Sequence, residues 1–88
     1  MKVKDGIAIR QVDDEYVLVD TGKIKPKFNG MIHLNETSKD IIDLLTKDDL
    51  SMDELIKKLL DIYDVDKETL EKEVANFIAQ LKEVNIII

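Results

Sequence analysis

The sequence contains no cysteine, which excludes a disulfide framework, thiolate zinc sites and cysteine nucleophiles. Glycine and proline are scarce as well, with three glycines and one proline in 88 residues, and no internal repeat or low-complexity tract is visible. No segment approaches the roughly 20 apolar residues that span a bilayer, and the N-terminal residues lack the apolar run of a signal peptide. The sequence therefore predicts one soluble domain, residues 1–88, in the cytoplasm and without a membrane segment.

Positive charge is also in short supply, and it is unevenly distributed. Residues 1–35 contain six Lys or Arg and five Asp or Glu, which gives a net charge of +1. Residues 36–88 contain seven and fourteen, which gives −7 and accounts for the formal net charge of −6 of the whole chain. Nucleic-acid affinity comes largely from Lys and Arg that neutralise phosphates, so this acidic second part opposes binding to DNA or RNA.

The residues that are present have the composition of a globular protein, 44% hydrophobic and 36% charged. In the first third of the chain, alternating apolar residues predict strands at 6–12 and 15–21, and a pair of aspartates between them predicts a hairpin turn of two to three residues. A loop rich in lysine follows, and residues 31–34 form a short third strand. This part of the chain is therefore expected to be an antiparallel sheet.

Apolar residues at helical spacing predict three helices in the remainder of the chain. Asn35 is an N-cap candidate for the first helix, and Ser51 with Glu54 matches a capping box at the start of the second. Asp66 is the expected N-cap of the third and longest helix, at about 67–84. The predicted fold is α+β, a three-stranded antiparallel sheet followed by a winged-helix-like three-helix bundle.

The chain shows no constellation typical of an active site or of a metal or cofactor site. His33 has no second histidine, cysteine or serine-based partner, and it should face away from whatever Ile32 and Leu34 cover, so an exposed or structural role is favoured over a proton-dependent contact. The acidic residues at 64–66 begin a calcium-loop pattern, but Thr69 occupies the glycine position and no correctly spaced glutamate follows. Helix caps and turns explain these acids better, and we expect a protein without catalytic activity.

The third strand is the main indication of function. It has no further strand after it in the sequence, and an open outer edge is either covered or used to add a strand from another chain. The edge is also short, and the apolar tail at 85–88 or the loop at 21–30 would close it by packing there; Phe28 in that loop either covers the core or lines a ligand pocket. Proline at Ile32 is expected to weaken strand addition, provided that the N–H of Ile32 points to the open edge.

The order of these motifs resembles the PqqD-like family, also called the precursor peptide recognition element of ribosomally synthesised and modified peptides. The matching segments are YVLV (16–19), FNGMIHLNET (28–37), IIDLL (41–45), SMDELIKKLLDIYDVD (51–66) and VANFIAQLKEVNII (74–87). Two positions depart from the family pattern: Ser38 replaces a common glycine, and Ile42 replaces a frequent aromatic residue. Both changes affect packing and leave the strand edge unaltered.

The resemblance implies capture of the leader segment of a precursor peptide and its delivery to a modifying enzyme, often a radical-SAM enzyme. In the family the leader adds as a fourth strand beside the third strand, in a groove against the third helix. The strand positions carried over to this chain are Met31, Ile32, His33 and Leu34. The groove positions carried over to the third helix are Lys67, Leu70, Glu71, Val74 and Ala75.

Two other functions remain open from the residues alone. A winged-helix DNA-binding regulator would present Lys or Arg on its recognition helix, whereas residues 66–84 contain three lysines and five acidic residues. An accessory subunit of another enzyme would use the same surface as a peptide carrier. The open edge could also pair with a second copy of the chain, so a homodimer is possible.

Overall fold

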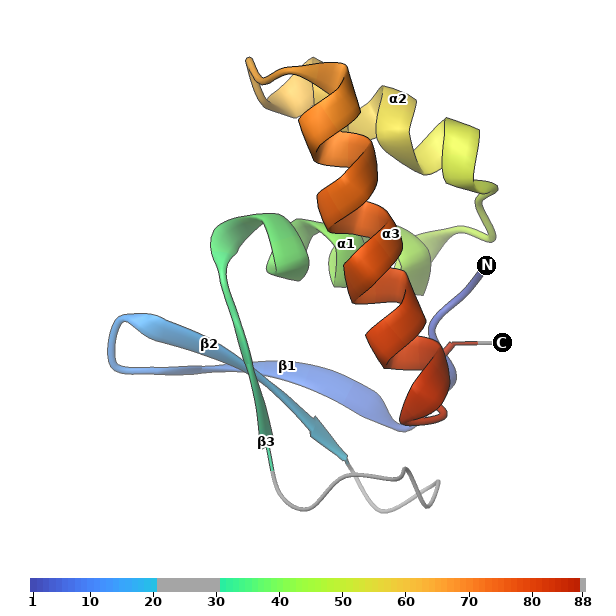
Figure 1. Cartoon of the computed structure of the whole chain (residues 1–88). Helices are drawn as coiled ribbons and strands as arrows, with labels where there is room; N and C mark the ends of the chain where they lie inside the picture. The colour runs from blue at the N-terminus through green and yellow to red at the C-terminus, as the bar shows by residue number, and fades with distance from the viewer. Residues whose placement is uncertain (21–30, 88) are drawn as a thin grey trace.

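The structure is a computed structural model that describes residues 1–20 and 31–87. In chain order its elements are β1 (Ile7–Val12), β2 (Glu15–Asp20), β3 (Met31–Leu34), α1 (Glu36–Lys47), α2 (Met52–Ile62) and α3 (Lys67–Glu83). The predicted α+β class, with the sheet preceding the helices, is confirmed (Figure 1). The predictions for the loop at 21–30, including Phe28, lie outside the described residues.

The sheet is antiparallel with the strand order β1-β2-β3. β1 and β2 form the predicted hairpin, in which Val12 pairs with Glu15 across a two-residue turn. Asp13 in this turn has a φ of 56°, a left-handed conformation that aspartate tolerates because its short polar side chain can hydrogen-bond the local backbone. On its other side β2 pairs with β3, with Leu18 opposite Ile32, so β2 is the central strand.

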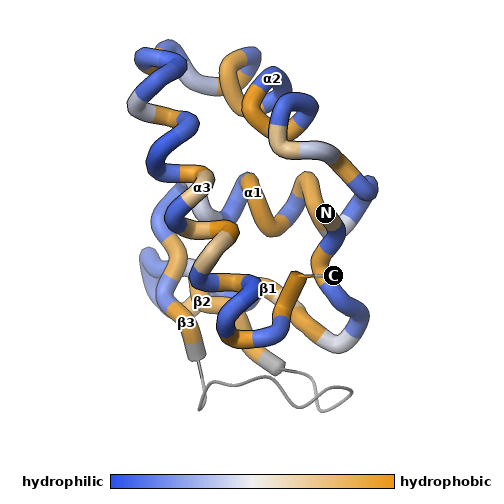
Figure 2. Tube along the Cα trace, turned by 45° about the vertical axis from the view of Figure 1, so that its right-hand side comes forward, coloured by the Kyte–Doolittle hydropathy of each residue, from blue (hydrophilic) through white to orange (hydrophobic). Residues whose placement is uncertain are grey.

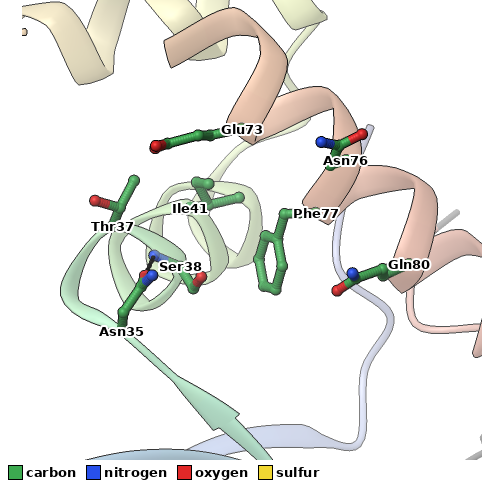
Figure 3. A pocket seen from close by; sticks show the side chains of 8 residues that line it. All are labelled: Asn35, Thr37, Ser38, Ile41, Glu73, Asn76, Phe77 and Gln80. Atoms are coloured by element: carbon green, nitrogen blue, oxygen red, sulfur yellow. Dashed lines mark hydrogen bonds between the residues drawn. The ribbon is translucent and has the colours of Figure 1, made fainter. Parts of the chain in front are cut away.

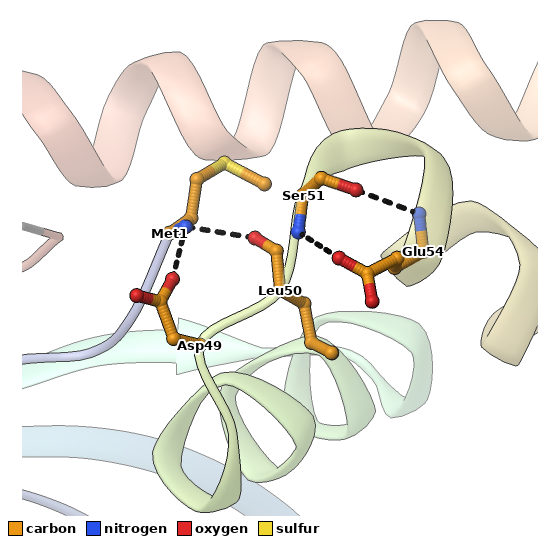
Figure 4. Close-up of polar contacts among 5 residues, drawn as sticks. All are labelled: Met1, Asp49, Leu50, Ser51 and Glu54. Atoms are coloured by element: carbon orange, nitrogen blue, oxygen red, sulfur yellow. Dashed lines mark hydrogen bonds and ion pairs between the residues drawn. The ribbon is translucent and has the colours of Figure 1, made fainter.

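Each helix begins at the residue that its sequence predicts. The Asn35 side chain accepts a hydrogen bond from the main chain one turn into α1, and Asp66 does the same for α3. At the start of α2, the Glu54 N–H donates to Ser51 Oγ at 3.2 Å and the Ser51 N–H donates to Glu54 Oε1 at 3.1 Å (Figure 4). This capping box lowers the pKa of Glu54 below its usual value, chiefly through the hydrogen bond from the Ser51 main chain.

The core lies between the helices and one face of the sheet (Figure 1). Apolar side chains spaced three or four residues apart on the helices meet alternate side chains of β2 and β3, as both periodicities require. The most deeply buried large side chains are Leu18, Ile41, Ile42, Leu45, Leu55, Leu59, Leu81 and Ile86. In the part of the chain that the structure describes, none of the helices has the length and apolar character required to cross a membrane.

The C-terminal tail packs back on the domain. Ile86 and Ile87 are buried, Val3 bridges to Ile87, and the Lys4 N–H donates to the Ile86 carbonyl at 2.9 Å. The beginning and the end of the described chain therefore lie side by side in both views (Figures 1 and 2). The N-terminal segment is also held at its other end, where the Leu50 N–H donates to the carbonyl of the first residue at 2.9 Å.

Candidate functional site

The outer edge of β3 is free of a neighbouring strand among the described residues. The sheet order places β2 on one side of β3 and no described strand on the other. The tail, which could have closed this edge, pairs instead with residues 3 and 4 beside the beginning of β1. Unpaired main-chain groups along an edge are the requirement for adding a further strand.

The register of the sheet determines which main-chain groups of β3 face outward. In a hairpin with a two-residue turn, the residues that flank the turn, here Val12 and Glu15, form a hydrogen-bonded pair. Hydrogen-bonded and non-hydrogen-bonded pairs then alternate along β1 and β2. Tyr16 and Leu18 are in non-hydrogen-bonded pairs with β1, so their main-chain groups point to β3. Their partners in β3 are Leu34 and Ile32, which therefore point inward. The outward N–H and C=O groups belong to Met31 and His33.

This register corrects one expectation from the sequence. The N–H of Ile32 points to β2 rather than to the open edge, so proline at Ile32 would break the sheet itself instead of testing strand addition. The informative position is His33, whose N–H points outward. The sequence could not decide between the two positions, because a predicted turn of two to three residues leaves the alternation undefined.

An apolar groove lies between β3 and the second half of α3. Its volume is about 300 Å³. The lining residues are Ile32, Phe77, Gln80, Leu81, Glu83 and Val84. Leu81 is buried, whereas Ile32, Phe77 and Val84 pack against the core and remain half-buried. Their partly exposed apolar surface is what an incoming side chain would cover, with a gain of roughly 25 cal/mol per Å² of apolar area.

A second pocket adjoins this groove between the beginning of α1 and α3 (Figure 3). Its volume is about 350 Å³. The lining residues are Asn35, Thr37, Ser38, Ile41, Glu73, Asn76, Phe77 and Gln80. Phe77 and Gln80 line both pockets, and in Figure 3 the Phe77 ring projects from α3 toward α1. The two pockets therefore form neighbouring compartments along one surface.

The strand residues predicted for the site have distinct environments. Ile32 is half-buried and lines the apolar groove. His33 lies on the opposite face of the sheet, as predicted, with a side chain that is 71% exposed and an Nδ1 atom 3.4 Å from Glu15 Oε2. Leu34 is only 7% exposed and belongs to the core. Met31 begins the strand and pairs with Val19.

The predicted residues on α3 lie mainly on the half of the helix that is distant from the sheet (Figure 1). Leu70 and Val74 are 3% and 0% exposed, so they are core residues and present no surface to a partner. Lys67 and Glu71 form an ion pair at 3.8 Å and line a pocket with residues of α2. Ala75 is exposed but lines none of these pockets.

The residues of α3 and its C-cap that border β3 lie about two to three turns further along the chain than the predicted set. They are Phe77, Gln80, Leu81 and Val84. The apolar residues of this set belong to the helical stripe in the sequence, and such a stripe predicts core residues rather than a binding surface. The apolar tail was a sequence signal for their position. Because the tail directly follows α3, a tail that packs beside the sheet requires the end of α3 to lie near the sheet as well.

A polar contact away from the groove holds α1 and α2 together. The Tyr63 hydroxyl at the end of α2 donates a hydrogen bond to Asp40 Oδ2 on α1. Burial of the phenol, and secondly this hydrogen bond, raise the pKa of Tyr63 to about 12. Tyr63 packs against the core, and its contact is structural.

No group of three or more His, Asp or Glu side chains in residues 1–20 and 31–87 is arranged to hold a metal ion. The acids at 64–66 that begin a calcium-loop pattern serve the turn before α3, where Asp66 is the N-cap. The geometry that stands out is therefore an open strand edge beside two pockets, which is suited to binding an extended chain.

Comparison with known proteins agrees with this geometry. A family model described as coenzyme PQQ synthesis protein D (PqqD) matches residues 15–87. The solved structure of TbiB1 in complex with the TbiA(beta) leader peptide is 26% identical, with a TM-score of 0.67, over 96% of this chain and 93% of that chain. No curated protein matches the sequence significantly. Because the family model covers most of the chain, this protein belongs to the PqqD family.

Proposed function

We propose that this protein binds the leader segment of a ribosomally synthesised precursor peptide. The observation that carries the proposal is the open outer edge of β3 beside an apolar groove. Membership of the PqqD family supports it, and so does the similarity to TbiB1, whose structure was solved with a leader peptide. A leader in extended conformation would supply main-chain partners for the edge and side chains for the groove.

In the proposed complex the leader becomes a fourth strand of the sheet. Its main chain pairs with the outward N–H and C=O groups of Met31 and His33, and alternate side chains point toward α3. The chain acts by binding rather than by catalysis, and it presents the leader to a separate modifying enzyme. A radical-SAM enzyme or a similar peptide-modifying enzyme is the proposed partner.

The test is an NMR titration with synthetic leader peptides of precursors found by searching the genes around the one for this chain. Amide shifts are expected along β3 and at 77–84 of α3, because these residues border the open edge and the groove. Shifts confined to α2, or no shifts at high peptide concentration, would remove the proposal. Sedimentation at the same protein concentration separates peptide binding from pairing of two copies through the same edge.

A pair of variants at His33 tests strand addition itself. His33→Pro deletes the outward N–H and is expected to weaken peptide binding about tenfold, which corresponds to 1.4 kcal/mol, while the fold tolerates proline at an edge position that faces solvent. His33→Ala keeps the main-chain donor and serves as the matched control. Equal affinities of the two folded variants would contradict pairing at this edge.

A further inference from the structure

The two pockets beside β3 differ in chemistry although they share Phe77 and Gln80 as a common wall. The groove near Ile32 is lined mainly by apolar side chains. The pocket at the beginning of α1 presents a carboxylate, amides and hydroxyls, contributed by Glu73, Asn76 and Thr37 among others. A peptide that follows β3 past its last residue would meet an apolar compartment first and a polar one beside it.

The polar pocket has the features of a site for a cationic side chain. Glu73 is the charged residue among the described residues that line it, and Figure 3 shows its side chain extending from α3 toward Thr37. Within residues 1–20 and 31–87, no lysine, arginine or histidine forms an ion pair with Glu73. A carboxylate beside amide and hydroxyl oxygens accepts hydrogen bonds from a lysine ammonium or an arginine guanidinium, which carry donors only.

The register of β3 relates this pocket to a position in the bound peptide. Ile32 and Leu34 both direct their side chains to the helices, so peptide residues directly opposite them also point to the helices. The residue opposite Ile32 faces the apolar groove. The residue opposite Leu34 lies at the end of β3 next to the beginning of α1, where Thr37, Ser38 and Ile41 line the polar pocket, so its side chain on the helix face lies beside that pocket.

Strand direction gives the order of the two peptide residues. The sheet is antiparallel, and antiparallel pairing is the commoner and slightly more stable arrangement. A peptide antiparallel to β3 reaches the position opposite Leu34 two residues before the position opposite Ile32. We infer that the peptide bound by this protein carries a lysine or arginine two positions before an apolar residue, with the cation paired to Glu73. The inference rests on the proposed function.

A random-peptide library displayed on phage tests this inference on the whole chain. Selected peptides are expected to share a lysine or arginine two positions before an aliphatic or aromatic residue. For one such synthetic peptide, replacing the basic residue by glutamine is expected to weaken binding to the unmodified chain at least fivefold. The same replacement should change binding to the Glu73→Gln variant by less than twofold, because the paired carboxylate is already absent.

The control variant is Glu71→Gln, which removes an exposed carboxylate from the same helix but on the side facing α2. It should retain the full fivefold effect, and thermal unfolding confirms that both variants are folded. Two outcomes overturn the inference: selected peptides that share the apolar residue but show no preference for a basic residue, and selected peptides that carry the basic residue after the apolar residue. If His33→Pro still weakens the binding of these peptides, the proposed function stands and only the inference fails. If no selected peptide is sensitive to His33→Pro, the proposed function fails together with the inference.

Discussion

The two halves of α3 carry one continuous apolar stripe, yet they meet different neighbours. In the first half, Leu70 and Val74 are buried against the other helices, and Lys67 pairs with Glu71 beside α2. In the second half, Phe77 and Val84 stay half-buried and border the edge strand β3. The same stripe therefore closes the core at one end of the helix and lines an open groove at the other.

This difference follows from the number of elements available to cover the helix. The first half is covered by a neighbouring helix, whereas the second half lies beside a sheet whose last strand is only four residues long. Apolar surface that no described element covers is where an external segment gains the most free energy by binding. The contrast predicts that substitutions in the two halves separate stability from binding.

The largest effect is expected for Leu70→Ala in the first half. Removal of a buried leucine leaves a cavity, so the free energy of unfolding should fall by about 2–5 kcal/mol. Peptide affinity of the fraction that remains folded should be unchanged, because Leu70 lines no part of the groove. Urea unfolding measures the free energy of unfolding, and calorimetric titration measures the peptide affinity. A tenfold loss of affinity would contradict the proposed difference between the two halves of α3.

The opposite pattern is expected for Phe77→Ala in the second half. Phe77 lines both pockets, and aromatic side chains in the centre of an interface commonly contribute more than 1 kcal/mol to binding. Peptide affinity should fall about tenfold or more, with a smaller loss of stability than Leu70→Ala causes, since Phe77 is only half-buried. Calorimetric titration beside urea unfolding again separates the two quantities, and a variant that loses only stability would place Phe77 in the core.

The smallest effect is expected for Tyr63→Phe, a substitution at the end of α2 and outside the groove. Loss of the hydrogen bond to Asp40 should lower the free energy of unfolding by about 1 kcal/mol without changing peptide affinity. The folded-state pKa of Tyr63 is raised to about 12 from an ordinary 10.0, so its contribution is complete below pH 10 and is lost as the pH rises toward 12. The variant should lack this alkaline loss, which unfolding curves at pH 9 and pH 11.5 measure.

Local features of the fold were predictable because short segments determine them. Asn35, the Ser51 and Glu54 capping box, and Asp66 define the helix starts through side-chain contacts that span only three residues. The hairpin and the third strand follow from alternation and turn residues. The order of three strands and three helices followed from the same segments, and the structure confirms it. The resemblance to the PqqD family is confirmed by the family model.

The candidate site was predictable only at the level of its elements. The sequence led to the third strand and the third helix as the elements of the site, and in the structure β3 and α3 border the apolar groove. The residues expected on α3 lie nearer its beginning than the residues that line the groove, because a helical stripe shows which face is apolar but not which end lies beside the sheet. The outward position in β3 was likewise undetermined until the two-residue turn fixed the alternation of the ladder.

The sequence by itself determined the elements, their caps and the absence of cysteine chemistry, since these depend on residue type and on spacing along a few turns. The tertiary structure decided which half of α3 meets β3, which N–H of β3 faces outward, and that Glu73 shares a pocket with the beginning of α1. The first and third of these relations join residues about 40 apart in the chain, as Asn35 and Phe77 are. Their proximity arises from the packing of whole elements on a common core rather than from any local preference.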